Sequence, residues 1–104
     1  LAMEMVLNDR RLTAAEAAQL GLVNYVVPVE SYLQKAIELA ASIAARAPVA
    51  VRAAKDAVNM AFEASLATGL AYERHHFYAL FATEDQREGM AAFLDKRKPT
   101  WRGR

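Results

Sequence analysis

The sequence contains no cysteine, which excludes disulfide bonds and cysteine-ligated metal sites. No apolar run approaches the 18 or so residues of a membrane-spanning helix, so we expect no membrane partner. The four glycines are isolated from one another and form no phosphate-binding loop. No secretory signal opens the chain, but Leu1 already stands in helical composition, so we expect a fragment whose targeting segment was left behind.

The composition is that of a packed chain. Hydrophobic residues make up 55% and charged residues 24% of the 104 residues, which argues against disorder and suits one domain. A chain of this size is expected to bury roughly two-thirds of its unfolded surface, enough for a modest core.

The charge is unevenly distributed along the chain. The formal net charge is +1, but residues 96–104 contain five basic residues and no acid, which leaves −4 on residues 1–95. An acidic body with a short basic tail indicates a small local anion site, and we expect no nucleic-acid partner.

Local signals in the first third of the chain predict a short helix. Thr13 and Glu16 have the spacing of a capping box, so a helix over residues 14–20 is expected. Gly21 follows as the residue that takes the left-handed conformation at little cost. Residues 22–27 are apolar and β-branched, and they predict either a single strand or an extended link.

The rest of the chain predicts longer helices. Apolar residues recur at helical spacing over residues 30–46, and Pro48 can begin the next helix. Ser65 and Thr83 are expected to cap two more.

The last of these helices is expected to hold Lys96 and Arg97 in its last turn and to end before Pro99. With residues 1–7 as the end of an earlier helix, the expected fold is all-α, with about five helices.

Two groups of polar residues could carry chemistry. His75 and His76 are adjacent and would point about 100° apart on a helix, whereas a zinc pair needs i, i+4 spacing, so no metal site is expected. Glu84, Asp85 and Glu88 could act as acid and base, but helix capping and solvation is the preferred interpretation. We therefore expect no catalytic residue in this chain.

The basic tail has two interpretations of its own. Lys96, Arg97 and Lys98 could be a solvated helix end that complements the helix dipole. Alternatively, clustered lysine and arginine residues could form a phosphate-binding patch.

Three stretches of the sequence together resemble the C-terminal region of the crotonase family, most closely the short-chain enoyl-CoA hydratases. They are RLTAAEA at residues 11–17 with the following GLV and VVP, the helix pair around Ala47-Pro48, and FYALFATED at residues 77–85 followed by EGM, AF and KRKP. The resemblance covers essentially the whole chain, and the order and spacing of the stretches are its most specific feature.

The resemblance implies that residues 1–104 are the helical C-terminal part of an α/β enzyme, whose β/α spiral core is absent here. Such enzymes add water to the double bond of 2-enoyl-CoA thioesters in fatty-acid β-oxidation. Two glutamates act as acid and base, and two backbone amides stabilise the thioester oxygen. These groups would lie upstream of Leu1, so the parent protein is expected to be a lyase and this fragment inactive.

The resemblance also implies a site and partners. Phe77 matches an aromatic residue beside the adenine of coenzyme A, and Lys96 matches a lysine that reaches its phosphates, often from a neighbouring subunit; Lys98 is a weaker match. An acyl-CoA substrate, no required cofactor and a homo-oligomer, trimer or hexamer in the parent, are expected. We expect a bacterial cytoplasmic location in preference to the mitochondrial matrix. The alternatives are another family member, such as an enoyl-CoA isomerase, and a non-enzymatic helical interaction module.

Overall fold

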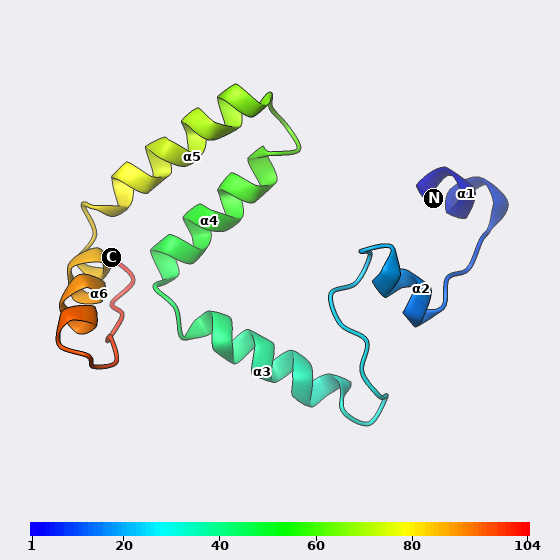
Figure 1. Ribbon diagram of the computed structural model, residues 1–104, viewed down its shortest axis with the longest axis horizontal. Helices are drawn as coiled ribbons and strands as arrows, with labels where there is room; N and C mark the ends of the chain where they lie inside the picture. The colour runs from blue at the N-terminus through cyan, green and yellow to red at the C-terminus, as the bar shows by residue number, and fades with distance from the viewer. The chain divides into compact units, whose positions relative to one another are not determined.

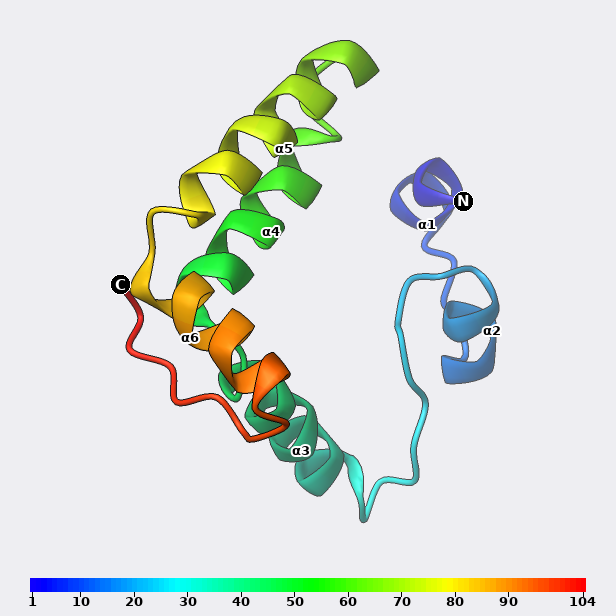
Figure 2. The ribbon, with the colours of Figure 1, turned by 60° about the vertical axis from the view of Figure 1, so that its left-hand side comes forward.

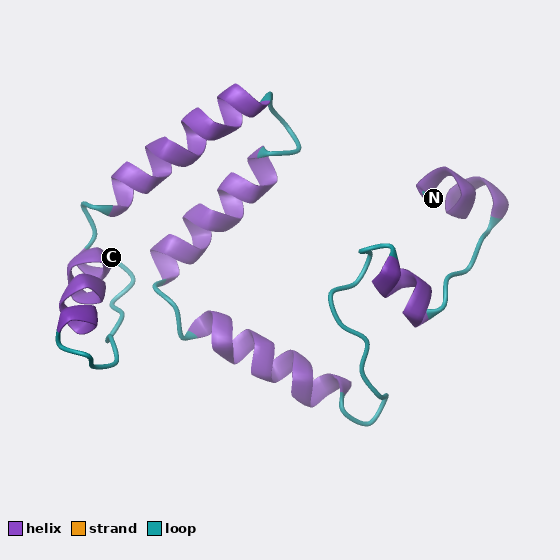
Figure 3. Ribbon diagram, in the orientation of Figure 1, coloured by secondary structure: helices purple, strands orange, loops and turns teal.

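The computed structural model describes all residues from 1 to 104 and contains helices and no strand (Figures 1 and 3). The six helices are α1 (Ala2–Asn8), α2 (Ala14–Gln19), α3 (Tyr32–Ala44), α4 (Pro48–Met60), α5 (Leu66–Leu80) and α6 (Glu84–Leu94). The prediction of an all-α chain is therefore confirmed, and residues 22–27 form an irregular link with no strand. None of the six helices combines the length and apolar character needed to cross a lipid bilayer.

The caps that the sequence predicts are present. The Thr13 hydroxyl accepts from the Glu16 amide at 3.2 Å, and the Thr13 amide donates to the Glu16 carboxylate at 2.8 Å. The hydrogen bonds that the Thr13 amide and hydroxyl donate to the Glu16 carboxylate lower the pKa of that carboxyl. The Ser65 and Thr83 side chains cap α5 and α6 by accepting a hydrogen bond from the backbone amide three residues further on. Pro48 is the first residue of α4.

Helix α6 is shorter than predicted. It ends at Leu94, and Asp95 is its C-cap, so the prediction that Lys96 and Arg97 occupy its last turn is wrong. The helix stops because Lys96 takes the left-handed conformation, at φ 51°, which turns the chain away from the helix axis.

The chain divides into two compact units, Leu1–Ile37 and Glu38–Arg104. Within the second unit, α4 and α5 run antiparallel and side by side, joined by a short link (Figures 1 and 2). After α6, the chain reverses, and its last residues return beside the start of α6 (Figure 1).

The predicted hydrophobic core is not present. Only Ala17, Ala92 and Asp85 are buried, and no large apolar side chain is among them. The chain exposes 8829 Å², whereas a compact monomer of 11.5 kDa is expected to expose about 5,800 Å². The composition is apolar enough for a core, but these helices turn their apolar faces outward, where other protein surface would have to cover them.

Candidate functional site

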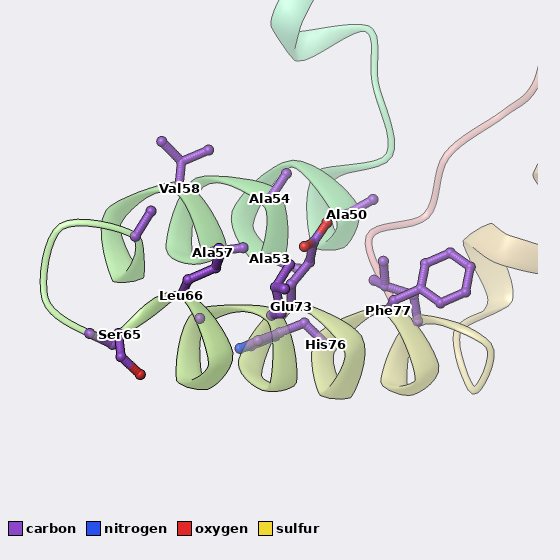
Figure 4. A pocket seen from close by; sticks show the side chains of 15 residues that line it. Ala50, Ala53, Ala54, Ala57, Val58, Ser65, Leu66, Glu73, His76 and Phe77 are labelled. Carbon is purple, nitrogen blue, oxygen red and sulfur yellow. The ribbon is translucent and has the colours of Figure 1, made fainter.

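Phe77 lies in the second half of α5, where it borders two apolar hollows. The larger, of about 580 Å³, runs between α4 and α5 and is lined mainly by small residues of α4 and by Leu66, Leu70 and Leu80 of α5. Phe77 stands at the end of this groove remote from Ser65 (Figure 4).

The second hollow, of about 400 Å³, connects Phe77 with the beginning of α6. Phe77 lines it together with Phe81, Thr83 and Gln86, and the Phe77 and Phe81 rings meet edge to face at 5.3 Å. Phe77 remains 55% exposed, so its ring offers an open face that a flat ligand could cover.

Lys96 occupies the turn that closes α6. The Arg97 amide donates to the Ala92 carbonyl at 3.0 Å, and the Lys96 amide donates to the Phe93 carbonyl at 3.3 Å. These two bonds define a Schellman motif with Lys96 at the left-handed position. Helix α2 ends in the same motif, where the Leu22 amide reaches the Ala17 carbonyl at 2.8 Å, but there the left-handed residue is Gly21.

Residues 95–104, which we call the C-terminal strap, are held against α6 by carboxylates. The Glu88 carboxylate accepts two hydrogen bonds from the Arg97 guanidinium, at 2.6 and 2.9 Å, and one from the Thr100 amide at 2.7 Å. The Arg97 contact and the Thr100 amide lower the pKa of Glu88 to about 2, and Glu88 in turn raises the pKa of Arg97.

Asp85 anchors the end of the strap. Asp85 is 3% exposed, and its carboxylate accepts hydrogen bonds from the amides of Arg102 at 2.6 Å and Gly103 at 2.9 Å. The first amides of α6, those of Glu84 and Asp85, donate to the Arg104 carbonyl. Asp85 is therefore a structural anchor rather than the solvated helix-end charge that the sequence suggested.

Trp101 fastens the middle of the strap to the end of α3. Its indole Nε1–H donates to the Ala45 carbonyl at 2.8 Å. Its six-membered ring lies over Gly89, where a Cβ would come within 3.3 Å of it. A larger residue than glycine at position 89 would displace the ring.

The strap separates its five cations into two groups. The side chains of Arg97, Arg102 and Arg104 form ion pairs with Glu88 and Glu84 of α6. The ammonium groups of Lys96 and Lys98 form none. The local charge of +5 in the sequence thus reduces to two lysines that are available to an external anion, and both lie just after α6.

Phe77 and Lys96 are not brought together within the chain. The hollow beside Phe77 borders the first turn of α6, whereas Lys96 lies two residues beyond its last residue, and eleven helical residues span about 16 Å. The two residues can contact one extended ligand, or they can serve ligands on different sides of α6.

The sequence did not predict that Glu88, Asp85 and Trp101 hold the strap against α6 and the end of α3. Glu88 and Arg97 are nine residues apart, and Asp85 and Gly103 are 18 apart, so no helical periodicity connects them. The available signal was the complementarity between an acidic first half of α6 and a basic tail that contains Pro99.

These features define a helical segment that has little hydrophobic core of its own and exposes apolar helix faces. Its last helix is followed by a turn, fixed by Glu88, that carries two lysines without ion pairs. The sequence matches the enoyl-CoA hydratase/isomerase family over residues 1–104, and the chain belongs to that family.

Individual relatives agree with this assignment. The chain is 46% identical to the mitochondrial enoyl-CoA hydratase of Pongo abelii over 98% of its length and to the 2,3-dehydroadipyl-CoA hydratase of Escherichia coli K12 over 100%. It covers 35% and 41% of those proteins. A crystal structure of enoyl-CoA hydratase from Bacillus anthracis superposes on 99% of this chain, and on 40% of its own chain, with a TM-score of 0.93 and 42% identity. The fold is therefore the helical part of the crotonase fold.

Proposed function

We propose that this chain is the C-terminal helical segment of an enoyl-CoA hydratase, a lyase that adds water to 2-enoyl-CoA thioesters in fatty-acid β-oxidation. The segment contributes oligomer contacts and part of the coenzyme A site, with Phe77 and Lys96 as ligand contacts. The catalytic glutamates belong to a spiral core outside residues 1–104. The family match along the whole chain and the hydratase names of its relatives support this proposal.

One observation carries the assignment of Lys96. A left-handed residue with a Cβ costs about 1–2 kcal/mol, and glycine avoids that cost, as Gly21 does in the same motif. The chain nevertheless places a lysine there and gives its ammonium group no acidic partner. A free ammonium on a fixed backbone suits a phosphate, which accepts charge-assisted hydrogen bonds.

The role of Phe77 rests on its exposure. Its ring is half-exposed at the junction of two apolar hollows, a surface on which an adenine ring can stack. Acyl-CoA is the proposed substrate, and because water and the thioester are the only reactants, the proposed reaction requires no cofactor.

The oligomer contacts rest on the apolar faces. Large apolar residues are exposed on every helix except α2, including Val6, Ile37, Val58, Leu66 and Phe93. Contiguous apolar surface beyond a few hundred Å² usually marks an interaction site. We assign these faces to the missing core and to neighbouring subunits, in a parent trimer or hexamer.

The location is also a proposal. A bacterial cytoplasmic enzyme is the preferred assignment, although the relatives include both bacterial proteins and proteins named as mitochondrial. Fractionation of the source cells tests it.

The experiment compares the full-length protein with the isolated chain. We expect the full-length protein to hydrate crotonyl-CoA, and the isolated chain to show no turnover that scales with its concentration and survives repurification. Turnover by the isolated chain would mean that residues 1–104 contain the catalytic groups. Because the family includes isomerases, the same preparation is assayed with a 3-enoyl-CoA. Rapid conversion to the 2-enoyl isomer without hydration would favour the isomerase alternative.

A further inference from the structure

At the start of the strap, cations with and without an ion pair alternate along the sequence. Lys96 and Lys98 have no acidic partner, whereas Arg97, which lies between them, directs its guanidinium back onto Glu88 of α6. The guanidinium of Arg97 is therefore drawn onto α6, while the lysines on either side of it keep ammonium groups without an acidic partner.

A single carboxylate fixes the loop that contains these lysines. Glu88 binds the Arg97 side chain on one side of Lys98 and the Thr100 amide on the other. On the opposite side, the Schellman bonds of the Lys96 and Arg97 amides fix the backbone of Lys96. Residues 96–100 are thus held at both ends and in the middle.

Glu88 is ionised, and can therefore bind Arg97 and the Thr100 amide, at any pH near neutrality. Its hydrogen bonds from Arg97 and Thr100 keep its carboxyl ionised well below neutral pH. It also neutralises Arg97, so that the loop offers an approaching anion two lysines rather than three competing cations.

We propose that Glu88 and Arg97 are positioning residues for coenzyme A. Their bidentate ion pair holds the 96–100 loop in the one shape that presents the ammonium groups of Lys96 and Lys98 together to the phosphate groups of the thioester. This inference rests on the proposed function. Neither Glu88 nor Arg97 touches the ligand, and their effect passes through the two lysines.

Pre-ordering of this kind improves affinity because the loop and its long side chains need not be ordered at binding. If the ion pair is lost, the ligand must order the loop itself. We expect a loss of about tenfold in affinity for the CoA thioester, with the chemical step unaffected.

The test uses Arg97→Lys in the full-length protein. This change retains the charge but removes the bidentate geometry, because lysine cannot bind a carboxylate with a planar fork. Arg102→Lys is the matched control, since Arg102 lies in the same strap and makes one exposed contact to Glu84 at 3.4 Å. We expect KM for crotonyl-CoA to rise about tenfold in Arg97→Lys with kcat unchanged, and neither to change in Arg102→Lys.

A double-mutant comparison separates this inference from the proposed function. In a Lys96→Ala, Lys98→Ala background, adding Arg97→Lys should leave KM where the two alanines put it, because nothing remains to be positioned. If the two alanines alone leave KM unchanged, the proposed CoA site is wrong. If they raise KM but Arg97→Lys does not, or if it raises KM by the same factor in both backgrounds, the positioning role is wrong.

Glu88→Gln provides a second route if Arg97→Lys fails to fold. Glutamine can still accept the Thr100 amide but loses the charge pair with Arg97. Amide hydrogen exchange should accelerate at Thr100 and Arg97 and stay unchanged at Val51 and Gly69 of α4 and α5. Unchanged exchange at Thr100 together with unchanged KM would also overturn the proposal.

Discussion

Replacing Lys96 by glycine and by alanine separates the two contributions of this residue. Both variants lack the ammonium group, but only alanine keeps a Cβ in the left-handed conformation at φ 51°. That conformation costs an L-residue about 1–2 kcal/mol, and glycine gives back about 0.5–1 kcal/mol through its greater freedom in the unfolded chain. Lys96→Gly should therefore be about 1 kcal/mol more stable than Lys96→Ala.

The two variants should be equal in coenzyme A binding. A charge-assisted hydrogen bond to phosphate contributes about 1.5–3 kcal/mol, so removing it should raise KM for crotonyl-CoA by roughly one to two powers of ten. The contact is remote from the reacting double bond, so kcat should change little. The difference in KM between wild type and either variant should also shrink as salt rises, because an exposed phosphate contact is screened.

The assays are denaturant unfolding and steady-state kinetics on the full-length variants. Gly21→Ala is the matched control, because Gly21 occupies the equivalent position after α2 at φ 73°, with no atom within 4 Å of an added Cβ. It should lose about 1 kcal/mol of stability and leave KM unchanged. Equal stability of the glycine and alanine variants of Lys96 would refute the left-handed assignment. An unchanged KM in both would refute the phosphate contact and leave Lys96 as a helix-end residue.

Three further outcomes follow from the same structure. The isolated chain should form dimers or larger species, because its apolar faces lack cover; a single 11.5 kDa species in sedimentation at tens of micromolar, roughly where weak interfaces fill, would contradict this. The pKa of Glu88 falls from 4.5 to about 2 on folding, so its contribution to stability is complete above about pH 5 and is lost as pH falls toward 2. The difference in unfolding free energy between wild type and Glu88→Gln should shrink across that window, and a constant difference would contradict the ion pair. Asp85→Asn should cost about 1–3 kcal/mol in denaturant unfolding, because one carboxylate oxygen that accepts a buried amide becomes an NH₂ group; a change below a few tenths would show that the strap is not anchored there.

The local signals of the sequence predicted most of the helix starts. Thr13, Ser65 and Thr83 cap helices where expected, because a cap depends only on residues three positions away. Helix ends are less local. The end of α6 was predicted at least three residues too late, because the sequence contains no glycine to mark it, and Lys96 takes a conformation that lysine seldom adopts.

The missing core has a different cause. Helical periodicity identifies an apolar stripe but not what covers it, and 55% hydrophobic residues suit equally a packed monomer and a segment that packs on other protein surface. The resemblance to the crotonase family implies what periodicity cannot, and under the proposed function the covering surface lies outside residues 1–104.

The candidate site shows the same division between local and distant information. The sequence placed five cations in nine residues and permitted either a solvated helix end or a phosphate patch. The structure distinguishes among these cations. Glu84 and Glu88 form ion pairs with the three arginines, which lie 9 to 20 residues away in the sequence, and the two lysines have no acidic partner. Arginine is the residue better suited to bidentate pairing with a carboxylate, and lysine is a flexible point charge that needs no fixed partner. Under the proposed function, the order lysine, arginine, lysine at positions 96–98 therefore has a simple reason: Arg97 braces the loop, and the two lysines remain for the phosphate groups.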